Sequence, residues 1–154
     1  MIVTVRREGQ TPRTLTNKAV DAEARCMLRA LKLPRAELSV VLCDDPTIHQ
    51  LNKQYRKKNK PTDVLAFALR EGPAGHLAGD ALGDVVISLE TAARQARERK
   101  VTVKEEVRML LAHGLLHLLG WDHQTDDEDA AMRAETERLM AAVARWARRN
   151  AAGA

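Results

Sequence analysis

The sequence contains few aromatic residues, few cysteines and no long apolar run. Two tryptophans, one tyrosine and one phenylalanine are spread over 154 residues, so aliphatic side chains must fill the core. No stretch reaches the roughly 18 consecutive apolar residues of a membrane-spanning helix, so we expect no membrane association. The opening MIVTVRREG is typical of a strand rather than a secretory signal. Cys26 and Cys43 show no CxxC spacing, which favours reduced, buried thiols in a cytoplasmic protein.

The chain is basic, with a formal net charge of +4 and a pI of about 9.3. This balance is compatible with a polyanionic partner but does not identify one. The densest positive cluster is formed by Arg56, Lys57, Lys58 and Lys60. Such a cluster is often only a solvated face, but lysine and arginine are also the side chains that hold phosphates in nucleic acids.

Hydrophobic periodicity predicts one α/β (α+β) domain over residues 1–154, with about four strands in a mixed sheet and about five helices. The expected strands are 2–6, 37–43, 63–68 and 84–89. The expected helices cover 16–32 and 90–99, and three more begin at an Asp45 cap, after Thr102 and after Thr125. Residues 71–83, EGPAGHLAGDALG, are expected to form a loop that contains His76.

The helix that begins after Thr102 is expected to be the central and most buried one. Thr102 and Glu105 form a capping box at its start. A wide apolar surface follows, and the residues that build it are Val107, Leu110, Leu111, Leu115 and Leu118. A buried helix of this kind would be a rigid platform for functional side chains.

Three of the five histidines fall within eleven residues, in the run HGLLHLLGWDH at 113–123. His113 and His117 are four residues apart, so they lie on one face of a helix in successive turns. Gly120 can end the helix in a left-handed turn and let the chain bring His123 back toward the other two. Three imidazoles with no evident fourth ligand are typical of a catalytic zinc site. The alternative is a set of hydrogen-bonded core histidines.

The spacing H-x-x-x-H-x-x-G-x-x-H is also that of the metzincin proteases. In those enzymes a glutamate directly follows the first histidine and acts as general base for the attacking water. Here that position is Gly114. The sequence therefore keeps the metal-binding pattern and lacks the residue on which peptide hydrolysis depends.

Together with TDVLAF at 62–67 and LGDVVIS at 82–88, the histidine motif resembles the YbeY family of bacterial metal-dependent endoribonucleases. The resemblance extends from about Val40 to about His123. It implies a zinc-dependent, single-strand-specific endoribonuclease that acts in the cytoplasm on ribosomal RNA of the small subunit, in 3′-end maturation and ribosome quality control. No DNA or membrane partner is expected. The family usually has serine where this chain has Ala66.

The resemblance also implies roles for individual residues. One zinc ion would be held by His113, His117 and His123, with one position open. The functionally important arginine of the family corresponds to Arg56, which would stabilise charge on the phosphate. The three lysines at positions 57, 58 and 60 would then follow the RNA backbone.

Two other functions stay open at this point. One is a zinc metallopeptidase-like hydrolase, favoured by the spacing and disfavoured by Gly114. The other is a non-catalytic, ribosome-associated RNA-binding protein with a structural metal.

The general base cannot be assigned from the sequence. Asp122, Asp63 and Asp84 are candidates, although a turn or capping role is the simpler interpretation of each. The chain shows no obvious aromatic surface for stacking bases, because Trp121 and Phe67 are expected to belong to the core.

Overall fold

The computed structural model describes residues 1–69, 75 and 79–152. The elements along the chain are β1 (Ile2–Glu8), α1 (Asn17–Ala30), β2 (Glu37–Cys43), α2 (Asp45–Arg56), β3 (Val64–Ala68), β4 (Ala81–Ser88), α3 (Leu89–Arg99), α4 (Val103–Leu118) and α5 (Asp126–Ala152). The four strands and five helices confirm the expected fold class. Most of the expected loop at 71–83, with His76, lies outside the described residues.

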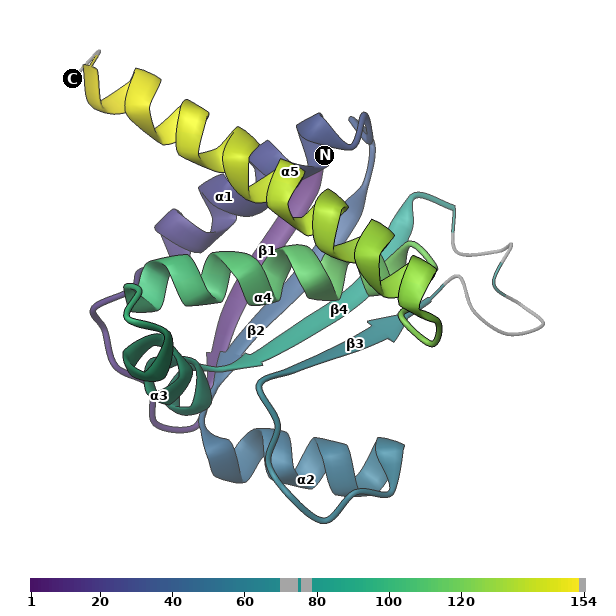
Figure 1. Cartoon of the computed structure of the whole chain (residues 1–154). Coiled ribbons are helices and arrows are strands. Elements are labelled where there is room, and N and C mark those ends of the chain that lie inside the picture. Colours follow the sequence, from purple (N-terminus) through teal and green to yellow (C-terminus); the bar gives the residue numbers. More distant parts are fainter. Residues whose placement is uncertain (70–74, 76–78, 153–154) are drawn as a thin grey trace.

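The four strands form one mixed sheet in the order β1-β2-β4-β3. β1 and β4 both pair with β2 in parallel, whereas β3 pairs with β4 in the antiparallel direction. β3 is therefore an edge strand, and one row of its backbone groups faces away from the sheet (Figure 1).

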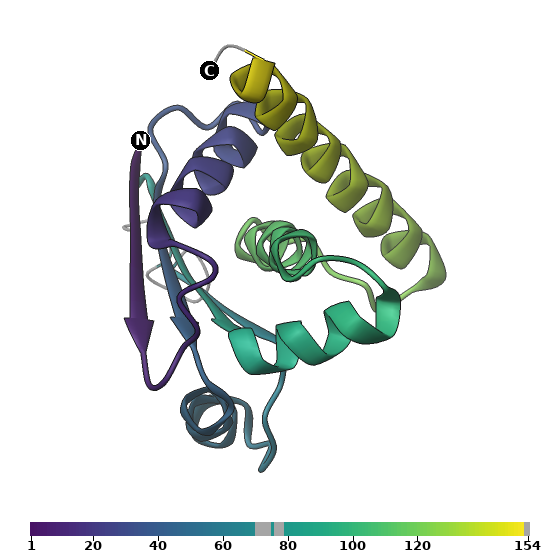
Figure 2. The same ribbon diagram turned by 90° about the vertical axis from the view of Figure 1, so that its left-hand side faces the viewer.

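Helices lie on both faces of the sheet, and the strands bury alternate side chains against them. The larger core joins one face to α1, α4 and α5, with Val40, Val85 and Ile87 among its strand residues. Figure 2 shows α4 enclosed by the sheet, α1, α3 and α5. A smaller cluster on the opposite face packs Ile48 of α2 against Val86.

α4 is the most enclosed helix, as the sequence predicts. The Thr102 hydroxyl caps it by accepting a hydrogen bond from the Glu105 amide at 3.1 Å. At its other end Gly120 has φ +93°, and its amide donates to the His117 carbonyl at 3.0 Å. The Trp121 amide donates to the Leu116 carbonyl at the same distance. This pair of bonds is a Schellman-type end, and it fixes the direction in which the chain leaves the helix.

The expected cap of α2 was displaced by one residue. The N-cap is Asp44, whose carboxylate accepts hydrogen bonds from the Thr47 amide at 3.0 Å and the Gln10 amide at 2.8 Å. The hydrogen bond from the Thr47 side chain is the main cause that lowers the pKa of Asp44. Asp45 is instead the first helical residue, and its carboxylate accepts from the Ser88 hydroxyl at 2.6 Å.

Gly114 allows α4 to approach the sheet closely. A Cβ atom at this position would lie 2.7 Å from Cγ1 of Val85 in β4 and 3.3 Å from Cγ2 of Val64 in β3. Both neighbours are β-branched and stiff, so they cannot turn aside cheaply. Position 114 therefore faces the sheet, and a glutamate there would push the helix away instead of reaching a substrate.

We predict that Gly114→Ala destabilises the protein by about 1–2 kcal/mol, because the cost of overpacking exceeds the gain in helix propensity. Urea denaturation of the two proteins measures the difference. The matched control is the same substitution in a Val85→Ala background, where the methyl group has room and the cost should largely disappear. An equal cost in both backgrounds would show that the contact with Val85 is not the reason for glycine.

Candidate metal centre

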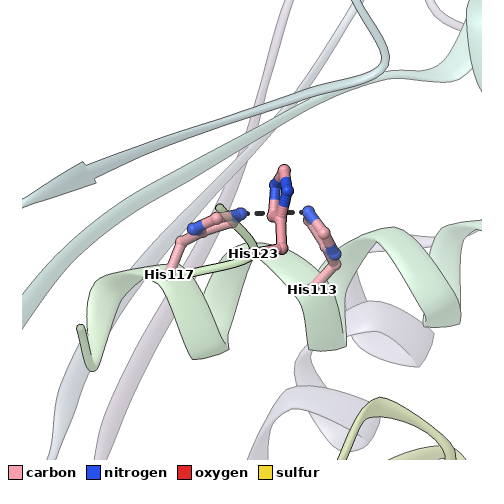
Figure 3. A group of neighbouring side chains, drawn as sticks. All are labelled: His113, His117 and His123. Atoms are coloured by element: carbon pink, nitrogen blue, oxygen red, sulfur yellow. Dashed lines mark hydrogen bonds between the residues drawn. The ribbon is translucent and has the colours of Figure 1, made fainter. Parts of the chain in front are cut away.

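The three histidines of the motif converge beside the C-terminal half of α4 (Figure 3). His113 and His117 project from successive turns of the helix, and their ring centroids are 4.6 Å apart. The ring of His123, from the loop after the helix, lies 5.7 Å from the first and 5.3 Å from the second. The turn at Gly120 thus brings His123 to the pair, as expected from the sequence.

The nitrogen atoms of this group suit a metal ion. One ligand atom from each ring lies within 4.8 Å of the others, and the Nε2 atoms of His113 and His117 are 3.0 Å apart. Around a tetrahedral zinc ion with bonds of about 2.0–2.1 Å, adjacent nitrogens would be about 3.3 Å apart. Only small side-chain adjustments separate the two geometries. Among the described residues no cysteine, aspartate or glutamate completes the group, so it is a three-ligand set.

The surroundings favour the neutral form of His113, which is the form of imidazole that binds metals. His113 and His117 are half-buried, whereas His123 is exposed. Burial is the main cause that lowers the pKa of His113, and the neighbouring rings of His117 and His123 lower it further. A nitrogen lone pair on His113 is therefore available to a metal near neutral pH. Because His123 is exposed, a metal ion or a substrate can reach the group from that side.

A cavity of about 340 Å³ opens beside His117. The edge strand β3 supplies one wall, and the end of α4 with its following loop supplies another. Its lining residues are Arg56, Val64, Leu65, Ala66, His117, Gly120, Trp121 and Asp122. Segments that are distant in the sequence therefore meet at one hollow next to the histidines.

Arg56 is the last residue of α2 and is held in this wall by two contacts. Its Nη2 atom donates to the Ala66 carbonyl of β3 at 2.6 Å. Its guanidinium carbon lies 5.0 Å from the ring centroid of Phe67, a cation–π geometry. Tyr55 packs edge-on against the same ring, with centroids 5.4 Å apart. Within the described chain Arg56 has no carboxylate partner, so its charge is available to an anionic ligand.

The lysines of the basic cluster lie further out. Lys57 is the C-cap that follows α2, with φ +60°, and all three lysines, at 57, 58 and 60, are exposed. None of them lines the cavity that contains Arg56 and His117. They could contact only parts of a ligand that extend beyond this cavity.

The three candidate bases differ in their positions. Asp122 lines the cavity, and its Oδ1 accepts from the His123 amide at 2.8 Å. Asp63 is engaged with the Val64 amide at 2.7 Å and the Gln95 side chain at 3.3 Å. Asp84 lines a hollow with Val41, Val86 and Phe67 on the face that α2 covers, away from the histidines. Of the three, only Asp122 faces the cavity.

The assignment of Trp121 to the core was wrong. Its side chain is 36% exposed and borders the cavity. Phe67 is half-buried and belongs to the smaller cluster on the other face of the sheet, where it supports Arg56. The sequence signal for the exposure of Trp121 is its place between Gly120, which ends the helix, and His123, which must turn back toward the other two histidines; such a segment has to be a loop.

A second cavity, of about 350 Å³, reaches His113 from the side of α5. Its two arginines are both paired, Arg99 with Glu106 at 3.1 Å and Arg133 with Asp129. Because both arginines are neutralised by carboxylates, this cavity attracts a phosphate group less strongly than the cavity that contains Arg56.

The chain is similar to proteins of one known family. The family model described as Endoribonuclease YbeY matches residues 4–144. The chain belongs to the endoribonuclease YbeY family. An endoribonuclease YbeY from Aquifex aeolicus is 46% identical over 128 residues, which are 83% of this chain and 83% of that protein. One from Syntrophotalea carbinolica is 43% identical over 118 residues, 77% of this chain and 79% of that protein.

A solved structure shares the fold. The solution structure of TM1509 from Thermotoga maritima superposes with a TM-score of 0.67 at 25% sequence identity. The match covers 97% of this chain and 93% of that one. Within the described residues, none of the helices has the length and apolar character needed to cross a bilayer.

We predict that replacing His123 by alanine lowers metal binding at least 100-fold and changes the melting temperature of the metal-free protein by no more than a few degrees. The reason is that His123 is exposed and lies outside both hydrophobic clusters. Metal analysis after dialysis and circular dichroism measure the two quantities, with His49→Ala, in α2, as control. Unfolding of the metal-free wild type would contradict an open, catalytic type of centre and favour a structural metal.

Proposed function

We propose that this member of the YbeY family is a zinc-dependent endoribonuclease specific for single-stranded RNA. The observation that carries the proposal is that one cavity is lined both by His117, a member of the three-imidazole group, and by Arg56, which has no carboxylate partner among the described residues. A zinc ion held by His113, His117 and His123 would supply a Lewis acid and a bound water with a pKa of about 7.

The residues around the cavity have separate tasks in this proposal. The three imidazoles would hold the ion, with one side of the group open at His123. Arg56 places a permanent positive charge where negative charge grows on the non-bridging phosphate oxygens during attack. Its contacts with Ala66 and Phe67 fix the guanidinium before substrate binds, so little reorganisation is needed. Asp122 lines the cavity, and in this proposal its carboxylate would accept a proton from an attacking group.

We further propose ribosomal RNA of the small subunit as the substrate, in 3′-end maturation and quality control within the cytoplasm. In this proposal residues 1–154 form one endoribonuclease domain. Lys57, Lys58 and Lys60 contact phosphates of the strand outside the cavity, consistent with their exposure just beyond Arg56.

Peptide hydrolysis is the weaker alternative. The edge strand β3 beside the histidines could pair with an extended peptide. However, the position of the protease glutamate is Gly114, which packs against Val85 and faces the sheet. A peptidase of that kind would have no base at the required place.

The test of the function is cleavage of an end-labelled single-stranded RNA by zinc-loaded protein, beside His117→Ala prepared identically. The proposal predicts cleavage by the wild type and at least a 100-fold lower rate with the variant. An RNA duplex and an unstructured peptide serve as comparison substrates. Peptide cleavage without RNA cleavage would overturn the proposal, and so would equal RNA cleavage by both preparations.

Arg56→Ala should lower kcat/KM for RNA cleavage by about 10²–10³-fold, the range for loss of one group that stabilises transition-state charge. The bound metal should stay at the wild-type level, because Arg56 contributes no ligand. Lys53→Ala in the same helix is the matched control, since it also removes one positive charge from α2. Equal rates for the Arg56 variant and the control would remove Arg56 from the mechanism.

A further inference from the structure

Trp121 lies at the surface, beside the cavity, instead of in the hydrophobic core. It is one of two tryptophans in the chain, and 36% of its side chain is exposed at the rim of the cavity. In the described structure no hydrogen bond from its indole and no contact with another aromatic ring is found. An indole that borders a cavity presents a flat apolar face to a ligand, and aromatic side chains are common in the lining of ligand sites.

The backbone fixes the start of the loop that presents this indole. Gly120 provides the left-handed residue, and the Trp121 amide is anchored on the Leu116 carbonyl at 3.0 Å. The position is therefore defined by the end of α4, the same helix that carries His113 and His117. Because the loop is so anchored, little backbone entropy is lost when a ligand packs against Trp121.

The other groups of the cavity define the chemistry of its ligand. Arg56, from the end of α2, offers an unpaired guanidinium, and His117 belongs to the metal group. The hollow of about 340 Å³ lies within the roughly 300–1,000 Å³ range of small-molecule sites. A flat apolar surface, a cation and a metal group around one hollow match the base and the phosphate of one nucleotide.

We infer that Trp121 is a stacking surface for the nucleobase next to the phosphate that is cleaved. The inference rests on the proposed endoribonuclease function and adds a binding residue to it. It also gives a physical reason for a preference for single strands. In a duplex both faces of a base are covered by its neighbours, so a base reaches the indole only when it is unstacked.

The first experiment reads stacking directly from Trp121 fluorescence. In the Trp146→Phe variant Trp121 is the sole tryptophan, and stopped-flow mixing of the zinc-loaded protein with hexa-adenylate reads binding before cleavage. We expect quenching by the hexa-adenylate and none by a hexamer of abasic ribose phosphates. The matched control is Trp121→Phe, which keeps only Trp146 in α5 and should show no quenching. Equal signals from both oligomers would overturn the inference.

The second experiment measures cleavage. Trp121→Ala should raise KM for single-stranded RNA by about 5- to 150-fold, the range for loss of one base–aromatic stack, while kcat changes little. Trp121→Tyr retains a ring and should stay within a few fold of the wild type. An unchanged KM in the alanine variant, or an equal rise in both variants, would contradict stacking.

The two experiments separate this inference from the proposed function. Quenching by the base-containing oligomer without any RNA cleavage by the wild type would overturn the nuclease proposal and leave the stacking surface in place. Cleavage without quenching would overturn only the role of Trp121.

Discussion

The close approach of α4 to the sheet is the contact on which the rest of the site depends. Gly114 leaves no space between the helix and Val85, and it directly follows His113, the first residue of the histidine group. The distance between α4 and the sheet therefore determines where the imidazoles of His113 and His117 lie relative to β3. If a methyl group at position 114 displaced the helix, the imidazoles of His113 and His117 would move away from the strand that supports Arg56. Interiors as tightly packed as this one transmit such a displacement instead of absorbing it.

The cavity combines segments that approach from different sides of the fold. α4 brings His117, the segment after the helix brings Trp121 and Asp122, and β3 brings the Ala66 carbonyl that holds Arg56. Phe67 links the two faces of the sheet, because its ring packs in the smaller cluster and supports the guanidinium at the edge. The position of Arg56 thus depends on α2 as well as on the strand. The proposed metal ligands and the proposed phosphate-binding arginine are therefore held by one connected framework, as a preorganised site requires.

The sequence predicted the parts of this arrangement that local rules determine. The helix carrying His113 and His117, its Thr102 cap and its end at Gly120 follow from spacing and capping preferences, and the structure has them. The approach of His123 to the other two histidines was also predicted from the sequence, because a Schellman-type helix end restricts the direction in which the chain continues.

The parts that depend on long-range packing were harder to predict from the sequence. Arg56 could be placed near the histidines only through the family resemblance, since α2 and α4 are joined by no local pattern. Asp84 was a candidate base until the sheet register put it on the face opposite the histidines. Trp121 was assigned to the core because large apolar residues usually are, although its loop exposes it.

The most direct test of the central claim is to titrate zinc into metal-free protein and follow RNA cleavage and the melting temperature together. If the three histidines form an open catalytic centre on a preformed scaffold, activity rises linearly and saturates at about one equivalent per chain. The melting temperature should rise only by the amount that ligand binding explains. Activity that is unaffected by removing the metal, or a chain that folds only after zinc is added, would contradict the account.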